Sequence, residues 1–466
     1  MTQLISLTVF GRGAVRRLSC QKSERLLDAL RRQQVYVSAA CGGRGTCGQC
    51  AIRLHTGELA VTAEDQAFFS PEQLLEGYRL ACCAYPKTDC TIEMMRGDET
   101  DFEVLAEQTT SCDTLQTASI AVDIGTTTLA FALVDEKTGR SVATHTSINH
   151  QRAFGADVIS RIQGANEGKL GDLQQSIRMD ILSGTDMLLA CAGMRWHQIT
   201  RVALAGNTTM MHLLCGYSCH TLGVAPFEPV NLDTVITNCN ALLNAQTDWN
   251  PPAVLLPGFS TFVGGDIAAG LLACGMDRAE RPCLFVDLGT NGEMALGNAH
   301  ALLCASTAAG PAFEGGHISW GMGSVVGAIC AVQASSQGMQ CKTIADAPPI
   351  GICGTGMVDV LASLLKTGGM EDSGRLADTF FKEGVPLAQT ADGRNIVMTQ
   401  KDVRELQLAI AAVRAGIEIL LKRSGTAPEN VEKVWLAGGF GRAMDVQNAV
   451  AIGLLPRTLE AKVQAV

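Results

Sequence analysis

The chain has 466 residues, of which 47% are hydrophobic and 18% charged, and its formal net charge at pH 7 is −10. This length and composition predict a globular protein of several domains. The negative charge and the absence of a basic stripe argue against a nucleic-acid-binding protein. No long apolar run predicts a membrane span and no segment resembles a signal peptide, so we expect a cytoplasmic protein whose 18 cysteines are mostly free thiols.

The first 95 residues predict a small domain of strands and one short helix. LISLTVF and AVRRLSC flank a glycine turn and predict a hairpin, and SERLLDALRR predicts a helix that Ser23 would cap. AIRLH and TIEMM predict further strands, with a short helix near 71–76 between them.

A glycine-rich stretch, CGGRGTCGQC at 41–50, carries three cysteines with C-x5-C-x2-C spacing, and 31 residues separate Cys50 from Cys82. Four thiolates from a loop and a distant segment suit an iron–sulfur cluster or zinc. Zinc ribbons generally use two separated C-x2-C pairs, and this region has one. The glycines favour the cluster, because they let backbone N–H groups point at sulfur. Cys83 is the alternative to Cys82 as the fourth ligand.

In element order and cysteine spacing, these residues resemble a [2Fe–2S] ferredoxin domain of the plant or adrenodoxin kind. The resemblance implies an α+β ferredoxin (β-grasp) domain over residues 1–95. It also implies a [2Fe–2S] cluster held by Cys41, Cys47, Cys50 and Cys82. Residues 96–117 are polar and acidic and predict a linker.

The pattern strand, D-x-G-T, strand occurs twice, in ASIAVDIGTTTLAFALVD and in CLFVDLGTNGEMALGN, and indicates an internal repeat. It is neither a Walker loop nor a Rossmann fingerprint. Glycine lets backbone N–H groups approach phosphate, threonine hydroxyls donate further hydrogen bonds, and aspartate holds hydrated Mg²⁺. Two such hairpins facing each other would bind a nucleotide from both sides. The residues expected to do so are Asp123, Gly125, Thr126, Thr127, Thr128, Asp287, Gly289, Thr290 and Asn291.

A third element, VEKVWLAGGFGRAM, predicts a buried strand that enters a glycine-rich turn at Gly438, Gly439 and Gly441, where adenosine would pack on the backbone. Together with the two hairpins, it resembles the acetate kinase, sugar kinase, Hsc70 and actin superfamily. The resemblance implies a two-lobed α/β actin-like ATPase (ASKHA) domain over 118–466 that binds ATP with Mg. The lobes are expected at about 118–280 and 281–466.

Asp266 opens the apolar stretch GDIAAGLLACG. In sugar kinases of this superfamily a similar stretch supplies the catalytic base, so here Asp266 would orient water, or it is simply a helix N-cap. Asn207 follows a strand end and is a further cofactor-binding candidate. Glu314 has either a metal or nucleotide role or a turn-stabilising one, and His212 is expected in the core.

The whole chain resembles the reductive activators of corrinoid proteins. The stretches that carry this resemblance are NHQRAFGADVISRI, LAGNTTMMHLLCG, GVAPF, STAAGPAFEGGHISWGMG and ICGTGMVDV. It implies ATP-dependent reduction of a cob(II)amide to a cob(I)amide in a methyltransferase system. The implied partners are a corrinoid protein, an unidentified upstream electron donor and a second copy of the chain in a homodimer. Longer members carry an extra domain between the ferredoxin and kinase-like parts, which this chain lacks.

Two other functions fit the same parts. One is a small-molecule kinase with a regulatory iron–sulfur cluster, and the other is a redox-sensing interaction protein switched by nucleotide. Activators of 2-hydroxyacyl-CoA dehydratases share the kinase-like fold but bridge two subunits with a [4Fe–4S] cluster. The ferredoxin domain in this chain argues against that group.

Overall fold

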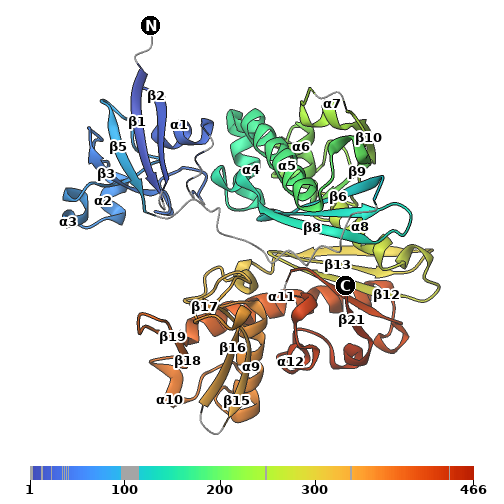
Figure 1. Ribbon diagram of the computed structural model, residues 1–466. Helices are drawn as coiled ribbons and strands as arrows, with labels where there is room; N and C mark the ends of the chain where they lie inside the picture. Colours follow the sequence, from blue (N-terminus) through green and yellow to red (C-terminus); the bar gives the residue numbers. More distant parts are fainter. Residues whose placement is uncertain are drawn as a thin grey trace. The chain divides into compact units, whose positions relative to one another are not determined.

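The computed structural model (Figure 1) shows two compact units, Met1–Gly265 and Asp266–Val466. It describes residues 4–11, 14–22, 24–33, 35, 37, 39, 41–95, 115–246, 249–335, 338–439 and 441–466. The predicted linker lies mostly outside these residues, as does Ser23. The lobe boundary near 280 stays a prediction.

The first unit begins with a five-stranded sheet in the order β2-β1-β5-β3-β4. β1 pairs antiparallel with β2 and parallel with β5, and β3 pairs antiparallel with both β5 and β4. Helix α1 packs its apolar side on this sheet, which confirms the predicted α+β ferredoxin fold. The elements are β1 (Leu4–Gly11), β2 (Ala14–Gln21), α1 (Leu26–Arg32), β3 (Ala51–Thr56), α2 (Ala63–Phe68), α3 (Pro71–Leu75), β4 (Tyr78–Leu80) and β5 (Cys90–Met94).

The rest of the first unit is a six-stranded sheet in the order β10-β11-β9-β6-β7-β8, with α5 packed on β7 and β8 (Figure 1). β6, β7 and β8 form an antiparallel meander, and β9 runs parallel to both β6 and β11. The elements are β6 (Ala118–Ile124), β7 (Thr128–Asp135), β8 (Ser141–Ile148), α4 (Val158–Gly164), α5 (Leu170–Ala192), β9 (Ile199–Gly206), α6 (Thr208–Cys215), β10 (Val235–Asn238), α7 (Cys239–Leu243) and β11 (Pro252–Leu255).

The second unit contains a five-stranded sheet in the order β14-β13-β12-β20-β21, with smaller sheets formed by β15–β17 and by β18 and β19. Its elements are α8 (Gly265–Ala273), β12 (Cys283–Leu288), β13 (Gly292–Gly297), β14 (Leu302–Thr307), β15 (Ala328–Ser335), β16 (Gly338–Thr343), β17 (Gly351–Ile352), α9 (Gly354–Thr367), α10 (Asp378–Phe381), β18 (Val385–Gln389), β19 (Asn395–Met398), α11 (Gln400–Ser424), β20 (Val434–Ala437), α12 (Val446–Ala451) and β21 (Val463–Ala465).

The two larger sheets repeat one topology. In each, an antiparallel meander starts with a D-x-G-T strand, and that strand also pairs parallel with a later strand: β6 with β9, and β12 with β20. Both sheets are covered by long helices with apolar cores of their own. This confirms the internal repeat and the two-lobed α/β fold.

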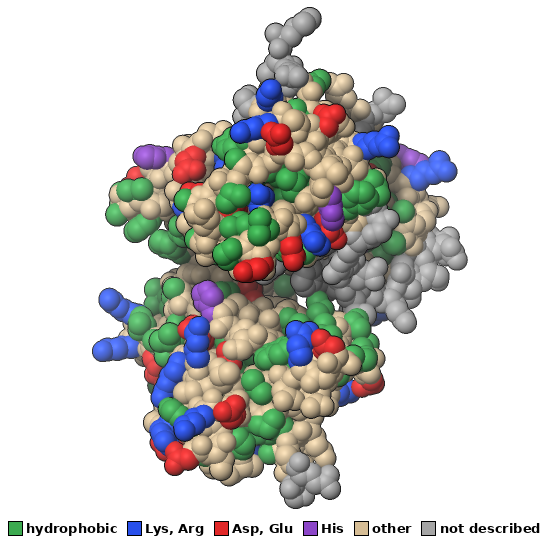
Figure 2. Space-filling view, turned by 90° about the vertical axis from the view of Figure 1, so that its left-hand side faces the viewer, with side chains coloured by type: hydrophobic (Ala, Val, Ile, Leu, Met, Phe, Trp, Pro, Cys, Tyr) green, Lys and Arg blue, Asp and Glu red, His purple; other side chains and the backbone are tan. Residues whose placement is uncertain are grey.

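The surface carries charges of both signs. On the face that Figure 2 shows, Lys and Arg side chains are interspersed with Asp and Glu side chains. Among the described helices, none combines the length and the hydropathy that crossing a membrane requires.

Candidate functional site

The cysteine loop at 41–50 lies between α1 and β3 of the ferredoxin domain and forms no regular secondary structure. Its glycines, which the sequence singled out, all have positive φ: 70° at Gly42, 90° at Gly43, 74° at Gly45 and 67° at Gly48. Residues with a Cβ rarely adopt such angles, so the loop can wrap tightly only because of its composition. One product of this wrapping is a hydrogen bond from the Arg44 backbone N–H to the Cys41 Sγ, at 3.3 Å.

The four predicted ligand cysteines come together as two pairs. The Cys47 thiol donates to the Cys41 Sγ at 3.4 Å, and the Cys50 thiol interacts with the Cys82 Sγ across the base of the loop. Two sulfurs on one tetrahedral metal with bonds of about 2.3 Å lie about 3.8 Å apart, close to the spacing of the first pair. Within the described residues no three His, Cys, Asp or Glu side chains surround one metal position. Two pairs of thiols are the arrangement that the two irons of a [2Fe–2S] cluster require.

Each pair contains one thiol that ionises easily. Burial alone would raise the pKa of Cys41, but hydrogen bonds from Thr46, Cys47 and Arg44 outweigh it and lower that pKa to about 6. A hydrogen bond from Cys50 lowers the pKa of Cys82 to about 7, while the pKa of Cys50 itself is raised. Cys41 and Cys82 are therefore the thiols that ionise most easily, whereas the pKa values of their partners Cys47 and Cys50 are raised.

Cys83 lies beside this group, with its Sγ 3.6 Å from that of Cys82. Burial and the neighbouring charge of Cys82 raise the pKa of Cys83 to about 12. Cys82 is buried and is the partner of Cys50, whereas Cys83 is partly exposed. The geometry supports Cys82 over Cys83 as the fourth ligand.

In the first unit, the D-x-G-T hairpin places Thr126 next to Asn207. The Asn207 side chain caps α6 and donates from Nδ2 to the Thr126 hydroxyl at 3.1 Å. The Gly125 N–H closes the turn by donating to the Thr128 carbonyl at 3.0 Å, so it is not available to a phosphate. Any backbone N–H group that approaches phosphate at this turn would therefore belong to another residue. Asp123 is exposed at the end of β6.

Two residues outside the motif hold this hairpin, and sequence reasoning did not single them out. The buried Arg161 donates from Nη2 to the Thr126 carbonyl at 2.5 Å and from Nε to the Gly155 carbonyl at 2.9 Å. Burial lowers its pKa to about 9. The Asn149 side chain donates to the Gly125 carbonyl at 2.8 Å. Both belong to the stretch NHQRAFGADVISRI, which served only for the family resemblance and to which no structural role was assigned.

In the second unit, the corresponding hairpin associates with acidic and glycine-rich segments. The Thr290 hydroxyl donates to Glu314 Oε2 at 2.7 Å. The parallel pairing of β12 with β20 brings Gly438 so close that a Cβ there would lie 2.7 Å from Asp287 Oδ1. The second motif, Glu314 and the glycine-rich turn are therefore neighbours. As in the first unit, the turn uses its own glycine amide, because the Gly289 N–H donates to the Asn291 carbonyl at 3.0 Å.

Asp266 lies in the first turn of α8, which begins at Gly265. Asp266 is therefore the second residue of the helix and not its N-cap, although its Oδ1 accepts a hydrogen bond from the Ile267 N–H at 2.8 Å. Burial raises the pKa of its carboxyl, as befits a proton acceptor more than a surface cap. Asp359 lies on helix α9 and accepts hydrogen bonds from the Val332 N–H and from Asn448.

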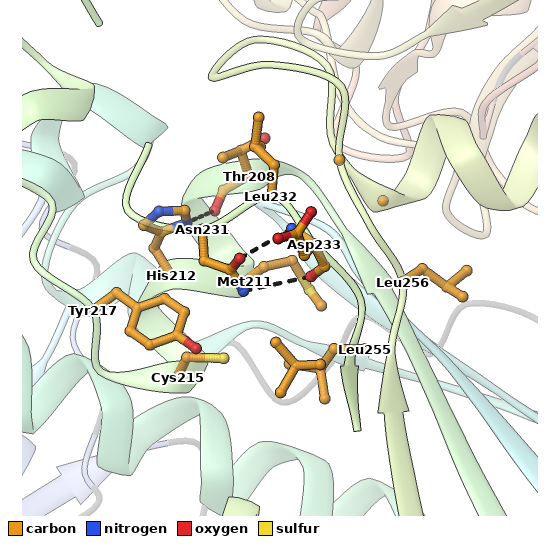
Figure 3. Close-up of a pocket in the computed structure, with 13 residues that line it drawn as sticks. Thr208, Met211, His212, Cys215, Tyr217, Asn231, Leu232, Asp233, Leu255 and Leu256 are labelled. Carbon is orange, nitrogen blue, oxygen red and sulfur yellow. Dashed lines mark hydrogen bonds between the residues drawn. The ribbon is translucent and has the colours of Figure 1, made fainter. Parts of the chain in front are cut away.

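A small cavity in the first unit, drawn in Figure 3, is lined by residues of α6 and the segment that follows it. His212 lies on its wall with both ring nitrogens bonded, to the Thr208 carbonyl at 2.8 Å and to the Val230 N–H at 3.0 Å. At about 30 Å³ the cavity holds one water molecule and excludes a nucleotide. His212 is thus a core residue, as predicted.

Comparisons with known proteins assign each part of the chain. Residues 281–466 match the model of the C-terminal domain of RACo, the ASKHA domain. Residues 118–279 match the RACo middle region, and residues 10–87 match the 2Fe-2S iron-sulfur cluster binding domain.

Individual relatives agree with these models. The corrinoid activation enzyme RamQ of Eubacterium limosum is 34% identical over 72% of this chain and 60% of its own length. A Co(II) methylated amine-specific corrinoid protein reductase of Methanosarcina barkeri is 26% identical over 72% of this chain and 65% of its own. This chain therefore spans less than two thirds of either relative. A solved structure of a reductive activator for corrinoid, iron-sulfur protein is 27% identical with a TM-score of 0.68, covering 99% of this chain and 90% of that one.

Proposed function

Because the chain belongs to the RACo family, we propose that it reductively activates a corrinoid protein and uses ATP to do so. One observation carries the proposal: a cysteine loop built as two thiol pairs is joined in one chain to two lobes that each present a D-x-G-T hairpin. A kinase needs no electron carrier, and a ferredoxin needs no nucleotide.

We assign Cys41, Cys47, Cys50 and Cys82 as the ligands of a [2Fe–2S] cluster. The paired thiols and the loop amide directed at Cys41 support this assignment. When bound, the cluster supplies one-electron transfer at a potential of roughly −400 mV. The protein loop contributes hydrogen bonds that stabilise negative charge on sulfur.

For the nucleotide, we assign different tasks to the two hairpins. The hydroxyls of Thr126, Thr127 and Thr128 are proposed to donate to phosphate oxygens, with Asn207 orienting the first of them. In the second unit, Asp287 and Asp266 are proposed to act on Mg²⁺ and on water, respectively, and Asp123 is a further candidate for Mg²⁺. The remaining proposed contacts to the nucleotide come from Thr290, Asn291, Gly438, Gly439 and Gly441, whereas Gly125 and Gly289 shape the two hairpin turns and use their amides there.

ATP is needed because the cobalt is harder to reduce than a plant-type cluster. Nucleotide alters an electron-transfer equilibrium only by binding two states of the protein with different affinity. A tenfold preference corresponds to about 59 mV for one electron. We propose that ATP favours the state that docks the corrinoid protein, where one electron converts cob(II)amide to cob(I)amide. That the chain forms a homodimer and that an upstream protein donates its electron stay predictions.

The test is an anaerobic mixture of the reduced protein with a cob(II)amide-loaded corrinoid protein, followed by cobalt absorbance with and without Mg-ATP. We expect cob(I)amide to accumulate with Mg-ATP and much less without it. Equal reduction in both samples would refute the role of ATP. Phosphate transfer to a small metabolite would instead favour the kinase, and nucleotide binding without turnover would favour the redox-sensing interaction protein.

A further inference from the structure

Helix α1 carries two consecutive arginines in opposite environments. The Arg32 side chain is 49% exposed and forms an ion pair with Glu24 at 2.9 Å. The Arg31 side chain is only 3% exposed. Its Nη1 lies 3.3 Å from Asp28 Oδ1, and its Nε and Nη2 have no hydrogen-bond partner among the described residues.

Asp28 does not by itself neutralise Arg31, because Arg25 already occupies both of its oxygens. Arg25 donates to Asp28 from Nε at 2.7 Å and from Nη2 at 2.9 Å. Arg31 is left with one long contact to a carboxylate that it shares. A buried cation with two unsatisfied N–H groups is costly unless a further negative charge lies close by.

The cysteine loop offers that negative charge. As a cluster ligand Cys50 is a thiolate, and its negative charge is among those that favour the protonated form of Arg31. Burial lowers the pKa of Arg31 to about 10, so Arg31 is charged at neutral pH. Helix α1 also contacts the loop directly, since Arg25 Nη1 donates to the Gly43 carbonyl at 3.1 Å. A [2Fe–2S] cluster with four thiolates carries net negative charge, which increases by one on reduction. A nearby buried cation stabilises the reduced state more than the oxidised one.

The neighbouring lobe of the same unit covers this arginine. The Arg31 guanidinium carbon lies 4.8 Å from the centre of the Phe154 ring, and Phe154 is itself buried. The Phe154 carbonyl comes so close to the loop that a Cβ on Gly42 would lie 2.8 Å from it. Lys169 of this lobe adds a second cation near Arg31. Shielding from water strengthens any interaction between Arg31 and the cluster, because fewer solvent dipoles screen it.

We propose that Arg31 tunes the reduction potential of the cluster, raising it through its buried positive charge, and that Phe154 keeps this charge out of water. This inference rests on the cluster ligands proposed above. Arg31 acts on the cluster through its charge and is not one of the cluster ligands. Because Phe154 and Lys169 belong to the lobe that carries the first D-x-G-T hairpin, this lobe contributes to the electrostatic environment of the cluster.

The experiment is an anaerobic redox titration of the full chain, read by the paramagnetic signal of the reduced cluster, with iron and sulfide content measured for every variant. For Arg31→Gln we expect the ratio of reduced to oxidised cluster at a fixed potential to fall about tenfold, a shift of about 59 mV to more negative potential. Arg32→Gln is the matched control, because it removes the same charge from the adjacent exposed position. Arg31→Lys should restore most of the wild-type potential.

Two further variants keep the inference falsifiable if Arg31→Gln does not hold its cluster. Asp28→Asn removes the shared carboxylate and should shift the potential in the positive direction. Phe154→Ala should shift it in the negative direction and reduce the effect of Arg31→Gln when the two are combined. Fully loaded Arg31→Gln that titrates like the wild type, or an equal shift in Arg32→Gln, overturns the inference. If Arg31→Gln lacks its cluster, an Asp28→Asn potential equal to that of the wild type overturns it. A wild-type protein without iron or a paramagnetic signal would instead refute the proposed cluster.

Discussion

The two D-x-G-T hairpins share a topology but differ in the charge that supports them. The first is held by the buried cation Arg161, which donates to the Thr126 carbonyl. The second has a carboxylate beside it, because Thr290 donates to Glu314. Repeated backbone architecture therefore does not imply repeated chemistry. A hairpin next to a cation suits phosphate, and a hairpin next to carboxylates suits a hydrated metal ion.

The largest effect is expected from Arg161→Met. It leaves the partly buried Thr126 carbonyl and the buried Gly155 carbonyl without this donor, at about 1–3 kcal/mol each. We expect the melting temperature of the protein to fall by roughly 5–15 °C and ATP binding to weaken. The matched control is Arg140→Met, at an exposed position of the same lobe. Calorimetry would contradict this account if both variants melted together.

Asp266→Asn tests whether the second unit supplies the base. We expect ATP turnover to fall by about 10²- to 10⁴-fold with little change in ATP affinity. Because burial raises the pKa of Asp266, wild-type turnover should be lost as pH falls through a value above the ordinary 3.8. The exposed Asp277→Asn is the control. If ATP turnover is lost over the same acidic pH range in Asp266→Asn and in Asp277→Asn, Asp266 is not the base.

Gly438→Ala tests the contact between the glycine-rich turn and the second hairpin. The added Cβ would lie 2.3 Å from the Leu288 carbonyl oxygen at a residue with φ of +95°. We expect destabilisation of about 1–3 kcal/mol, measured as a lower melting temperature. At the adjacent Gly439 nothing lies within 4 Å of the new Cβ, so Gly439→Ala should melt close to the wild type. Equal losses in both variants would show that the close contact is not the cause.

The smallest effect is expected from Glu314→Gln, which removes the carboxylate beside Thr290. The Mg²⁺ concentration for half-maximal ATP turnover should rise roughly fivefold, equivalent to about 1 kcal/mol. Glu383→Gln, at an exposed position of the same unit, is the control. Asn207→Ala in the first unit should change ATP affinity without this Mg²⁺ dependence. If the Mg²⁺ concentration for half-maximal ATP turnover rises equally in Asn207→Ala and Glu314→Gln, the two hairpins do not differ in metal binding.

Local patterns predicted much of the fold. The cysteine spacing with its glycines indicated a wrapped loop, and four positive φ angles confirm it. The D-x-G-T repeat indicated two similar lobes, and both sheets have that topology.

Other features could not be predicted because they depend on partners far apart in the chain. Arg161 looked like an ordinary helix cation until folding placed it under Thr126, 35 residues away. Nothing in the sequence distinguishes Arg31 from Arg32, yet one is buried and the other is exposed. The amides of Gly125 and Gly289 are used by the turns themselves, which the D-x-G-T pattern alone does not reveal.

By itself the sequence determined which functional groups are present and which local conformations they favour. Cysteine spacing, glycine content and strand periodicity can do this because they act over a few residues. Tertiary structure decided which charges lie next to which groups. Burial and long-range packing set the strength of those interactions, and neither is encoded within any short segment of the chain.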